Sequence, residues 1–330
     1  GITACLIVGA FAERMKFSAV MLFMVLWFTF SYLPIAHMVW FWAGPDAYTD
    51  AAAAEAAGKT AGFLFQKGAL DFAGGTVVHI NAGIAGLVGC LLVGKRKGYG
   101  TQAMAPHNVP FIMVGAALLW VGWFGFNAGS ALESGAGAGL AMANTFVATA
   151  AAGLAWMIVE FIFRWKMSLL GLASGVVAGL VAVTPAAGFV GPMGAAILGA
   201  VAGVVCLFFC TAIKWMLRYD DSLDVFGIHC IGGIIGALGT GLLVSPEFGG
   251  TGILDYAAKP GAVVVAEYVR DAQLIAQAKA VGLTLLWSGI GSAIIFKIVD
   301  VVIGARVHPE GEQAGLDLSQ HGERGYVYEH

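Results

Sequence analysis

Long apolar runs separated by short polar stretches recur along nearly the whole chain. A helix of about twenty apolar residues is long enough to cross about 30 Å of hydrocarbon. The runs are continuously apolar and lack the alternation of outer-membrane strands, so they predict helices. Eight complete spans are expected, near residues 17–40, 71–94, 109–130, 139–163, 168–186, 193–216, 223–244 and 278–304.

A ninth apolar run, residues 2–12, is too short to span and ends at Glu13 and Arg14. No Met precedes it, and it lacks the charged start and cleavage site of a signal peptide. We expect the chain to begin inside a helix, with earlier helices of the natural protein absent. The expected organisation is a transmembrane domain over residues 1–305 and a cytoplasmic regulatory tail over residues 306–330.

Composition supports an all-α polytopic membrane protein. The 330 residues are 59% hydrophobic and 11% charged, and the mean hydropathy is +0.84. Soluble domains carry about 25% charged residues. The chain has no Walker loop, dinucleotide fingerprint, GxSxG or HExxH motif, so an enzyme is not expected, and neither is a cofactor, a metal or a nucleic-acid partner.

The distribution of Lys and Arg predicts the orientation in the membrane. Of the 17 basic residues, twelve fall on the side that carries the C-terminal tail. The other five fall on the opposite side, at Lys59, Lys67, Lys259, Arg270 and Lys279. Because cytoplasmic loops are enriched in Lys and Arg, we expect a multi-pass protein of the cell membrane with its C-terminus in the cytoplasm.

Small residues predict a tight bundle. Gly171, Gly175 and Gly179 repeat every four residues, a spacing that lets transmembrane helices approach closely. The five cysteines lie within apolar spans, which favours packed thiols over disulfides. Two loops on the side opposite the tail, residues 41–70 and 245–277, are unusually long and carry no motif that assigns them a role.

Two segments of the chain resemble each other. Residues 79–89, HINAGIAGLVG, and 229–239, HCIGGIIGALG, share the histidine, Gly at +4, Ile at +5 and Gly at +7 and +10. Each histidine also follows an aspartate, Asp71 or Asp224. The loop count sends the two segments through the membrane in opposite directions. This pattern predicts a helical bundle with inverted repeats, which is typical of transporters and channels.

His79 and His229 are the strongest candidates for chemistry. Ionisable groups inside a membrane are costly, and they usually pair with each other or line a pathway. Two neutral imidazoles in contact could each donate from one nitrogen and accept at the other, and so pass a proton along an apolar pore. In the alternative, each ring only satisfies a backbone carbonyl in a packed core.

Other candidates lie near the outer ends of spans, and each has a structural alternative. Asp71 either caps a helix or attracts a cation by its field. Trp40 either anchors the interface or offers its ring face to a cation. Trp123 and Phe126 either pack or narrow the mouth of a pore, where small residues such as Ser130 follow. Asp224, in contrast, lies at the cytoplasmic end of its span and is expected to cap its helix.

These stretches together resemble the Amt/MEP/Rh ammonium transporter family, in its bacterial Amt branch. The matching segments are DFAGGTVVH at 71–79, SYLPIAHMVW at 31–40, WFGFNAGSA at 123–131, DVFGIH at 224–229, GLD at 315–317 and HGE at 321–323. The resemblance implies a fold of eleven helices in two inverted five-helix repeats plus a last helix, assembled as a homotrimer. This chain would supply the end of helix 3 and helices 4–11.

The resemblance also implies roles for these residues. His79 and His229 would be the twin histidines of a pore proton relay. Trp40 and Ser130 would form an outer ammonium-binding vestibule, with Asp71 supporting it from beneath. Phe126 would be a gate ring, and Trp123 would line the pore beside it.

The implied function is ammonium transport in which the ion is deprotonated and ammonia is conducted through an apolar pore. The implied partner is a PII-type signal protein at the cytoplasmic face. Three alternatives remain. They are a neutral ammonia gas channel, an ammonium sensor of the same fold, and a membrane metalloenzyme that uses the two histidines.

Overall fold

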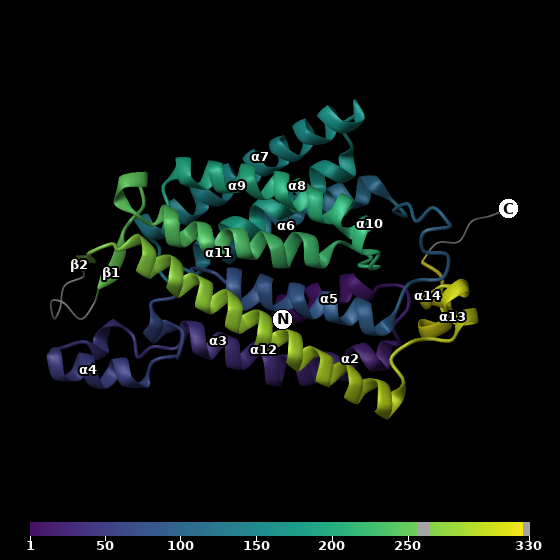
Figure 1. Cartoon of the computed structure of the whole chain (residues 1–330), viewed down its shortest axis with the longest axis horizontal. Helices are drawn as coiled ribbons and strands as arrows, with labels where there is room; N and C mark the ends of the chain where they lie inside the picture. Colours follow the sequence, from purple (N-terminus) through teal and green to yellow (C-terminus); the bar gives the residue numbers. More distant parts are fainter. Residues whose placement is uncertain (256–263, 326–330) are drawn as a thin grey trace.

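The computed structural model describes residues 1–255 and 264–325, and its long helices run roughly along one axis (Figure 1). Within this part of the chain, seven helical stretches are long and apolar enough to cross a membrane. They are Phe17–Trp40, Gly75–Val93, Val109–Gly129, Ala136–Arg164, Pro192–Leu217, Phe226–Leu243 and Arg270–Ile303. The prediction of an all-α polytopic membrane protein is confirmed.

The individual elements follow the chain in this order. The first helices are α1 (Ile2–Val8), α2 (Phe17–Trp27), α3 (Leu33–Trp40), α4 (Ala51–Thr60), α5 (Asn81–Val93), α6 (Val109–Gly129), α7 (Ala136–Arg164) and α8 (Leu169–Val183). The later ones are α9 (Pro192–Phe208), α10 (Lys214–Leu217), α11 (Ile231–Leu243), α12 (Arg270–Ile303), α13 (Pro309–Ala314) and α14 (Leu316–His321). Strands β1 (Ile253–Asp255) and β2 (Val264–Ala266) pair antiparallel, with Ile253 opposite Ala266.

Wider π-helical turns occur in four of the spans, inside two of them and at the start of the two that carry the histidines. They are η2 (Phe28–Tyr32), η5 (Gly75–Ile80), η6 (Phe209–Ile213) and η7 (Phe226–Cys230). A π-turn shifts the hydrogen-bond ladder from i−4 to i−5, and such turns are common at functional sites. Nothing in the hydrophobic pattern predicts them, because they leave the composition of the span unchanged.

The helix α8 is shorter than the predicted span of 168–186. It has 15 residues, about 22 Å of rise, and therefore falls short of the hydrocarbon thickness. Most of its residues after Gly175 are buried against other helices. Backbone that leaves a helix at membrane depth is tolerated where protein covers it, so α8 does not need to span as a regular helix.

Close packing holds the second half of the bundle together. Gly179 of α8, and Gly199 and Gly203 of α9, each lie against the backbone of α7, where an added Cβ would overlap it, and a Cβ at Gly175 would overlap the Trp156 side chain of the same helix. This confirms the expected role of the small-residue rows. All five cysteines are free thiols, as predicted.

The two ends of the bundle differ. The helix α4 and the β1–β2 hairpin lie at one end, and α13 and α14 lie at the other (Figure 1). The predicted outer loop 245–277 is only partly described, because residues 256–263, including Lys259, lie outside the described residues. The last five residues of the predicted tail, 326–330, also lie outside them.

Candidate functional site

The two predicted histidines meet in the interior. His79 lies in η5 and His229 in η7, and their Nδ1 atoms are 3.2 Å apart. The ring centroids are 5.3 Å apart with an interplanar angle of 19°. His79 is fully buried and His229 is 8% exposed. The segment η5 also contacts α11, and η7 contacts α5, so each repeat packs its π-turn against the helix of the other.

Aromatic rings cover one side of this pair. Trp123 stacks on His79 with centroids 5.4 Å apart and an angle of 14°, and Phe126 lies 6.3 Å from His79. The indole Nε1 of Trp123 donates to Thr184 Oγ1 at 2.9 Å. The structure therefore brings four predicted site residues into one cluster whose only titratable members are the histidines.

Asp71 caps the helix that carries His79. Its carboxylate accepts hydrogen bonds from the backbone amides of Gly74, Gly75, Thr76 and Val77, at 2.6–3.1 Å. Burial raises the pKa of Asp71 to about 6, although the four amide hydrogen bonds favour the charged form. The apolar run predicted a span from residue 71, but the helix begins at Gly75. The cap explains this difference, because the Asp71 side chain binds the first free amides of the helix from outside it.

The predicted vestibule residues are only partly brought together. The Trp40 indole Nε1 donates to the backbone oxygen of Asp71 at 2.8 Å, so these two residues are in contact. Ser130 Oγ donates to the backbone oxygen of Phe126 at 3.0 Å, one turn back in its own helix. Ser130 is therefore connected to the gate residue, and no described hydrogen bond links it to Trp40.

The prediction that Asp224 caps the second histidine helix is wrong. Asp221 does so, because its carboxylate accepts from the amides of Val225 and Phe226 at 3.0 and 2.7 Å. Asp224 instead accepts from Lys214 Nζ at 2.7 Å and has a positive φ of 58°. The available signal was spacing: Asp221 precedes its histidine by eight residues, as Asp71 precedes His79.

A metal is not supported by the described side chains. In residues 1–255 and 264–325 no group of three or more His, Cys, Asp and Glu side chains lies close enough to hold an ion. The Nε2 atom of His79 is buried and has no hydrogen-bond partner among these residues. The pair thus offers two imidazoles and no third ligand.

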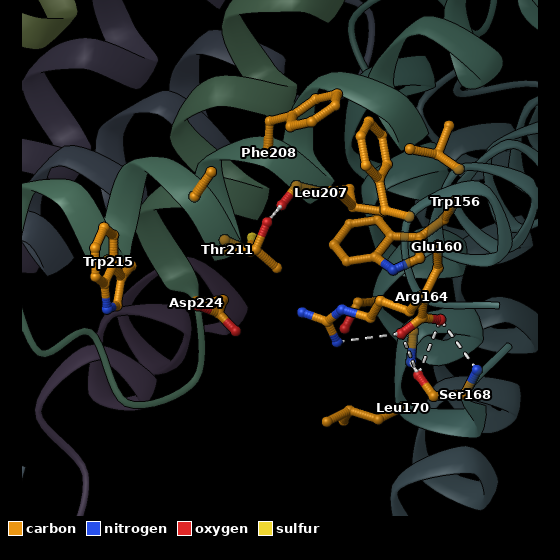
Figure 2. A pocket seen from close by; sticks show the side chains of 16 residues that line it. Trp156, Glu160, Arg164, Ser168, Leu170, Leu207, Phe208, Thr211, Trp215 and Asp224 are labelled. Atoms are coloured by element: carbon orange, nitrogen blue, oxygen red, sulfur yellow. Dashed lines mark hydrogen bonds and ion pairs between the residues drawn. The ribbon is translucent and has the colours of Figure 1, made fainter. Parts of the chain in front are cut away.

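A cavity of about 750 Å³ lies elsewhere, at the end of the bundle that carries the tail. Figure 2 shows Trp156, Phe208 and Trp215 around it, and the Arg164–Glu160 ion pair, 3.6 Å long, at its wall. Glu160 also accepts from Ser168 Oγ at 2.8 Å. Asp224 lines this cavity, but none of the predicted relay, gate or vestibule residues does, so the cavity is separate from the histidine cluster.

Sequence and structure comparisons agree with one another. A protein named ammonium transporter from Aquifex aeolicus is 48% identical over 325 residues, which cover 98% of this chain and 69% of that protein. One of the same name from Mycobacterium tuberculosis is 45% identical, with 99% of this chain and 65% of that protein covered. The chain thus spans about two thirds of these relatives.

Solved structures give the same answer. Saccharomyces cerevisiae Mep2 superimposes with a TM-score of 0.78 at 31% identity, covering 94% of this chain and 65% of that one. A structure titled Sensor Amt Protein gives a TM-score of 0.82 at 28% identity, covering 96% and 73%. A family model described as Ammonium Transporter Family matches residues 1–326. The chain belongs to the ammonium transporter family.

Proposed function

We propose that the protein transports ammonium across the cytoplasmic membrane by conducting ammonia through the bundle and its proton separately. The observation that carries the proposal is the 3.2 Å contact between the Nδ1 atoms of His79 and His229, inside an apolar and aromatic interior. The names of the relatives support the substrate.

The proposed outer site uses Trp40, Asp71 and Ser130. The hydrogen bond from Trp40 Nε1 to Asp71 O holds the indole against the capped end of the histidine helix. An indole face held this way can attract a cation, which contributes about 0.5–2 kcal/mol. Four amides occupy the carboxylate of Asp71, so this residue supports the site from beneath instead of binding the ion directly.

The proposed selectivity comes from removing a proton. Ammonium and potassium have the same charge and similar size, so a pore that fits one cation would leak the other. Neutral ammonia can cross an apolar passage that would impose a large desolvation cost on a bare ion. Phe126 is the proposed gate ring, and Trp123 is proposed to line the passage next to His79.

The proposed relay passes the proton through the histidine contact. Each neutral imidazole carries one donor and one acceptor nitrogen, so a proton taken up at one ring can be passed through the shared hydrogen bond and released from the other. Electrogenic transport follows if the proton moves in step with ammonia. If it does not, the protein is a neutral gas channel.

The test is current on solid-supported membranes from proteoliposomes of the full-length protein, with ammonium and then potassium applied. Wild type should give a saturable ammonium current and no potassium current. His79→Leu and His229→Leu should reduce it by about 100-fold or more, because proton transfer by a positioned side chain contributes at least that factor. The control is His37→Leu, at an exposed position of α3.

Other results would favour other functions. Unchanged current in the two histidine variants would reject the relay. A silent wild type with ammonia-driven internal alkalinisation would indicate a gas channel. A wild type silent in both assays would favour an ammonium sensor, the second candidate, which the likeness to a structure titled Sensor Amt Protein supports.

We also propose the orientation, assembly and partner expected from the sequence. The excess of Lys and Arg at the tail end of the bundle supports a cytoplasmic C-terminus, and Arg306 joins the tail to the loop after α5 by donating to Val93 O and Lys95 O. A homotrimer and binding of a PII-type protein rest on family membership. Native mass spectrometry would count the subunits and detect that complex.

A further inference from the structure

The two histidine-bearing π-turns leave the same gap in the backbone ladder. In η5 the amide of Asn81 bonds to Thr76 O and Val78 O, and so bypasses Val77 O. In η7 the amide of Ile231 bonds to Phe226 O and Ile228 O, and so bypasses Gly227 O. In a regular α-helix both bypassed carbonyls would accept from those amides.

Among the described residues, a side-chain hydrogen bond fills the gap in only one of the two turns. The Nδ2 atom of Asn81 donates to Val77 O at 3.1 Å, which replaces the bypassed backbone bond. Asn81 is fully buried. The residue at the matching place in the second repeat is Ile231, which has no donor. The repeat is therefore symmetric in backbone but not in how the turn is held.

Two buried serine hydroxyl groups donate hydrogen bonds to Asn81 itself. Ser31 Oγ, from η2, donates to Asn81 Oδ1 at 3.0 Å, which fixes the direction of the side-chain amide. Ser288 Oγ, from α12, donates to the backbone oxygen of Asn81 at 2.8 Å. Both serines are fully buried. The helix α12 packs against α5, and the bond from Ser31 adds η2, so three parts of the bundle meet at Asn81.

The ring of His79 depends on this turn for its direction. Its described hydrogen bond is the one to His229, and its Nε2 has no partner among the described residues. The bypassed carbonyl lies two residues before His79, and Asn81 lies two residues after it. An error in the turn would therefore change the Nδ1–Nδ1 distance directly, because the ring is carried by the backbone between these points.

We infer that Asn81, held by Ser31 and Ser288, is a positioning residue that fixes the His79 ring in the proton relay. The inference rests on the proposed transport function. His229 has no such anchor among the described residues, because Ile231 stands where the first turn has Asn81, so the two histidines are not held in the same way.

The chain offers a matched set of variants. Asn81→Asp removes the donor to Val77 O and changes the size of the side chain little. Ser31→Ala removes the hydroxyl that orients Asn81, and Ser31→Thr keeps it. The control is Ser292→Ala, which breaks the buried bond from Trp27 Nε1 to Ser292 Oγ, 3.0 Å long, between α2 and α12 without touching the π-turn.

Two measurements should be made on the full-length protein in liposomes. One is the ammonium current, and the other is solid-state ¹⁵N NMR of the assigned His79 ring nitrogens. Asn81→Asp and Ser31→Ala should lower the current by about 10- to 100-fold, as expected for a misplacement of about 1 Å. They should also shift or broaden the His79 ring signals. Ser31→Thr should restore both, and Ser292→Ala should leave both unchanged.

The outcomes separate this inference from the proposed function. If Asn81→Asp and Ser31→Ala match Ser292→Ala in current and ring signals, the positioning role is wrong. If Asn81→Asp does not fold, the Ser31→Ala and Ser31→Thr pair decides alone. If the wild type carries no current, the proposed transport mode fails, and the ring signals still report whether Asn81 positions His79.

Discussion

Two contacts orient the Trp123 side chain: its ring face stacks on His79, and its indole N–H binds Thr184. Its ring lies 14° from the plane of His79, and its Nε1 donates to Thr184 Oγ1 at 2.9 Å. The Thr184 hydroxyl in turn donates to Leu180 O at 2.7 Å. A single buried hydroxyl therefore serves as acceptor for the indole and as donor to α8, and it sets the orientation of the ring beside the histidine.

Thr184→Val should destabilise the protein by about 1–3 kcal/mol, because it leaves the buried indole N–H without an acceptor. The measurement is unfolding in mixed detergent micelles. The control is Thr240→Val, since Thr240 is equally buried but its hydroxyl only donates to Gly236 O in its own helix. Equal losses for the two variants would mean that the indole bond contributes nothing.

At the scale of elements, two glycines set how closely the histidine helices approach. Gly83 and Gly233 each lie four residues after their histidine. An added Cβ at Gly83 would overlap the backbone of Cys230, and one at Gly233 would lie 2.9 Å from Gly75 O. The shared glycine at +4 in the two segments is thus explained by contact: each helix needs a bare backbone where the other carries its π-turn.

Gly83→Ala should push α5 away from η7 and lengthen the contact between His79 and His229. We expect the ammonium current to fall by about 10- to 100-fold, since the proposed relay needs its nitrogens within hydrogen-bond distance. Gly282→Ala in α12 is the control, because a Cβ there meets open space. A Gly83→Ala variant that keeps wild-type current would show that the helix spacing is not limiting.

The sequence predicted the elements that change the hydrophobic pattern or repeat a motif, and it did not predict the others. Apolar runs predicted the spans, and the repeated HxxxGIxG pattern predicted that His79 and His229 meet. The π-turns leave no such mark, and so the role of Asn81 was not visible. The prediction named Asp224 alone as the cap, because a position next to the apolar run suggests a cap, whereas capping depends on the backbone path into the helix.

At the scale of the whole molecule, a buried charge cluster joins distant segments at the tail end. Arg96 forms an ion pair with Asp220, with Nη2 and Oδ1 2.7 Å apart. Arg14, fully buried, donates to Asp220 O and, at 2.7 Å, to Gly94 O. The cluster connects the segment after α1, the loop after α5 and the loop before η7. The cluster therefore links the segment that carries α5 to the segment that carries η7 at the tail end of the bundle.

Asp220→Asn should destabilise the protein by about 1.5–3 kcal/mol at neutral pH, because it removes the charge from the buried acceptor of the Arg96 hydrogen bonds, while Arg96 keeps its pair with the exposed Glu13. The control Glu55→Gln, in an exposed pair with Lys59, should cost less than about 1 kcal/mol. Unfolding of the wild type and both variants in detergent micelles across a pH series checks both values.

The same cluster predicts an acid dependence. Burial alone would raise the pKa of Asp220, but the hydrogen bonds from Arg96 outweigh it and hold the pKa below the ordinary value of 3.8. Its stabilisation is therefore complete above about pH 4 and is lost as the pH falls through the lowered pKa. The difference in free energy of unfolding between wild type and Asp220→Asn should become smaller in that range. If this difference stays constant as the pH falls, the ion pair is not its source.

The contact between His79 and His229 joins the same atom of both rings at 3.2 Å, a distance at which two neutral rings share a single hydrogen between their Nδ1 atoms. One ring must offer it and the other must receive it, so the pair always has a polarity that its symmetric backbone lacks. In the proposed relay, a proton that enters at one outer nitrogen and leaves at the other reverses that polarity. The next proton from the same side must wait until the rings return. The pair would therefore pass one proton per cycle and then return to its starting orientation. The rate of that return step would limit the turnover number of the transporter.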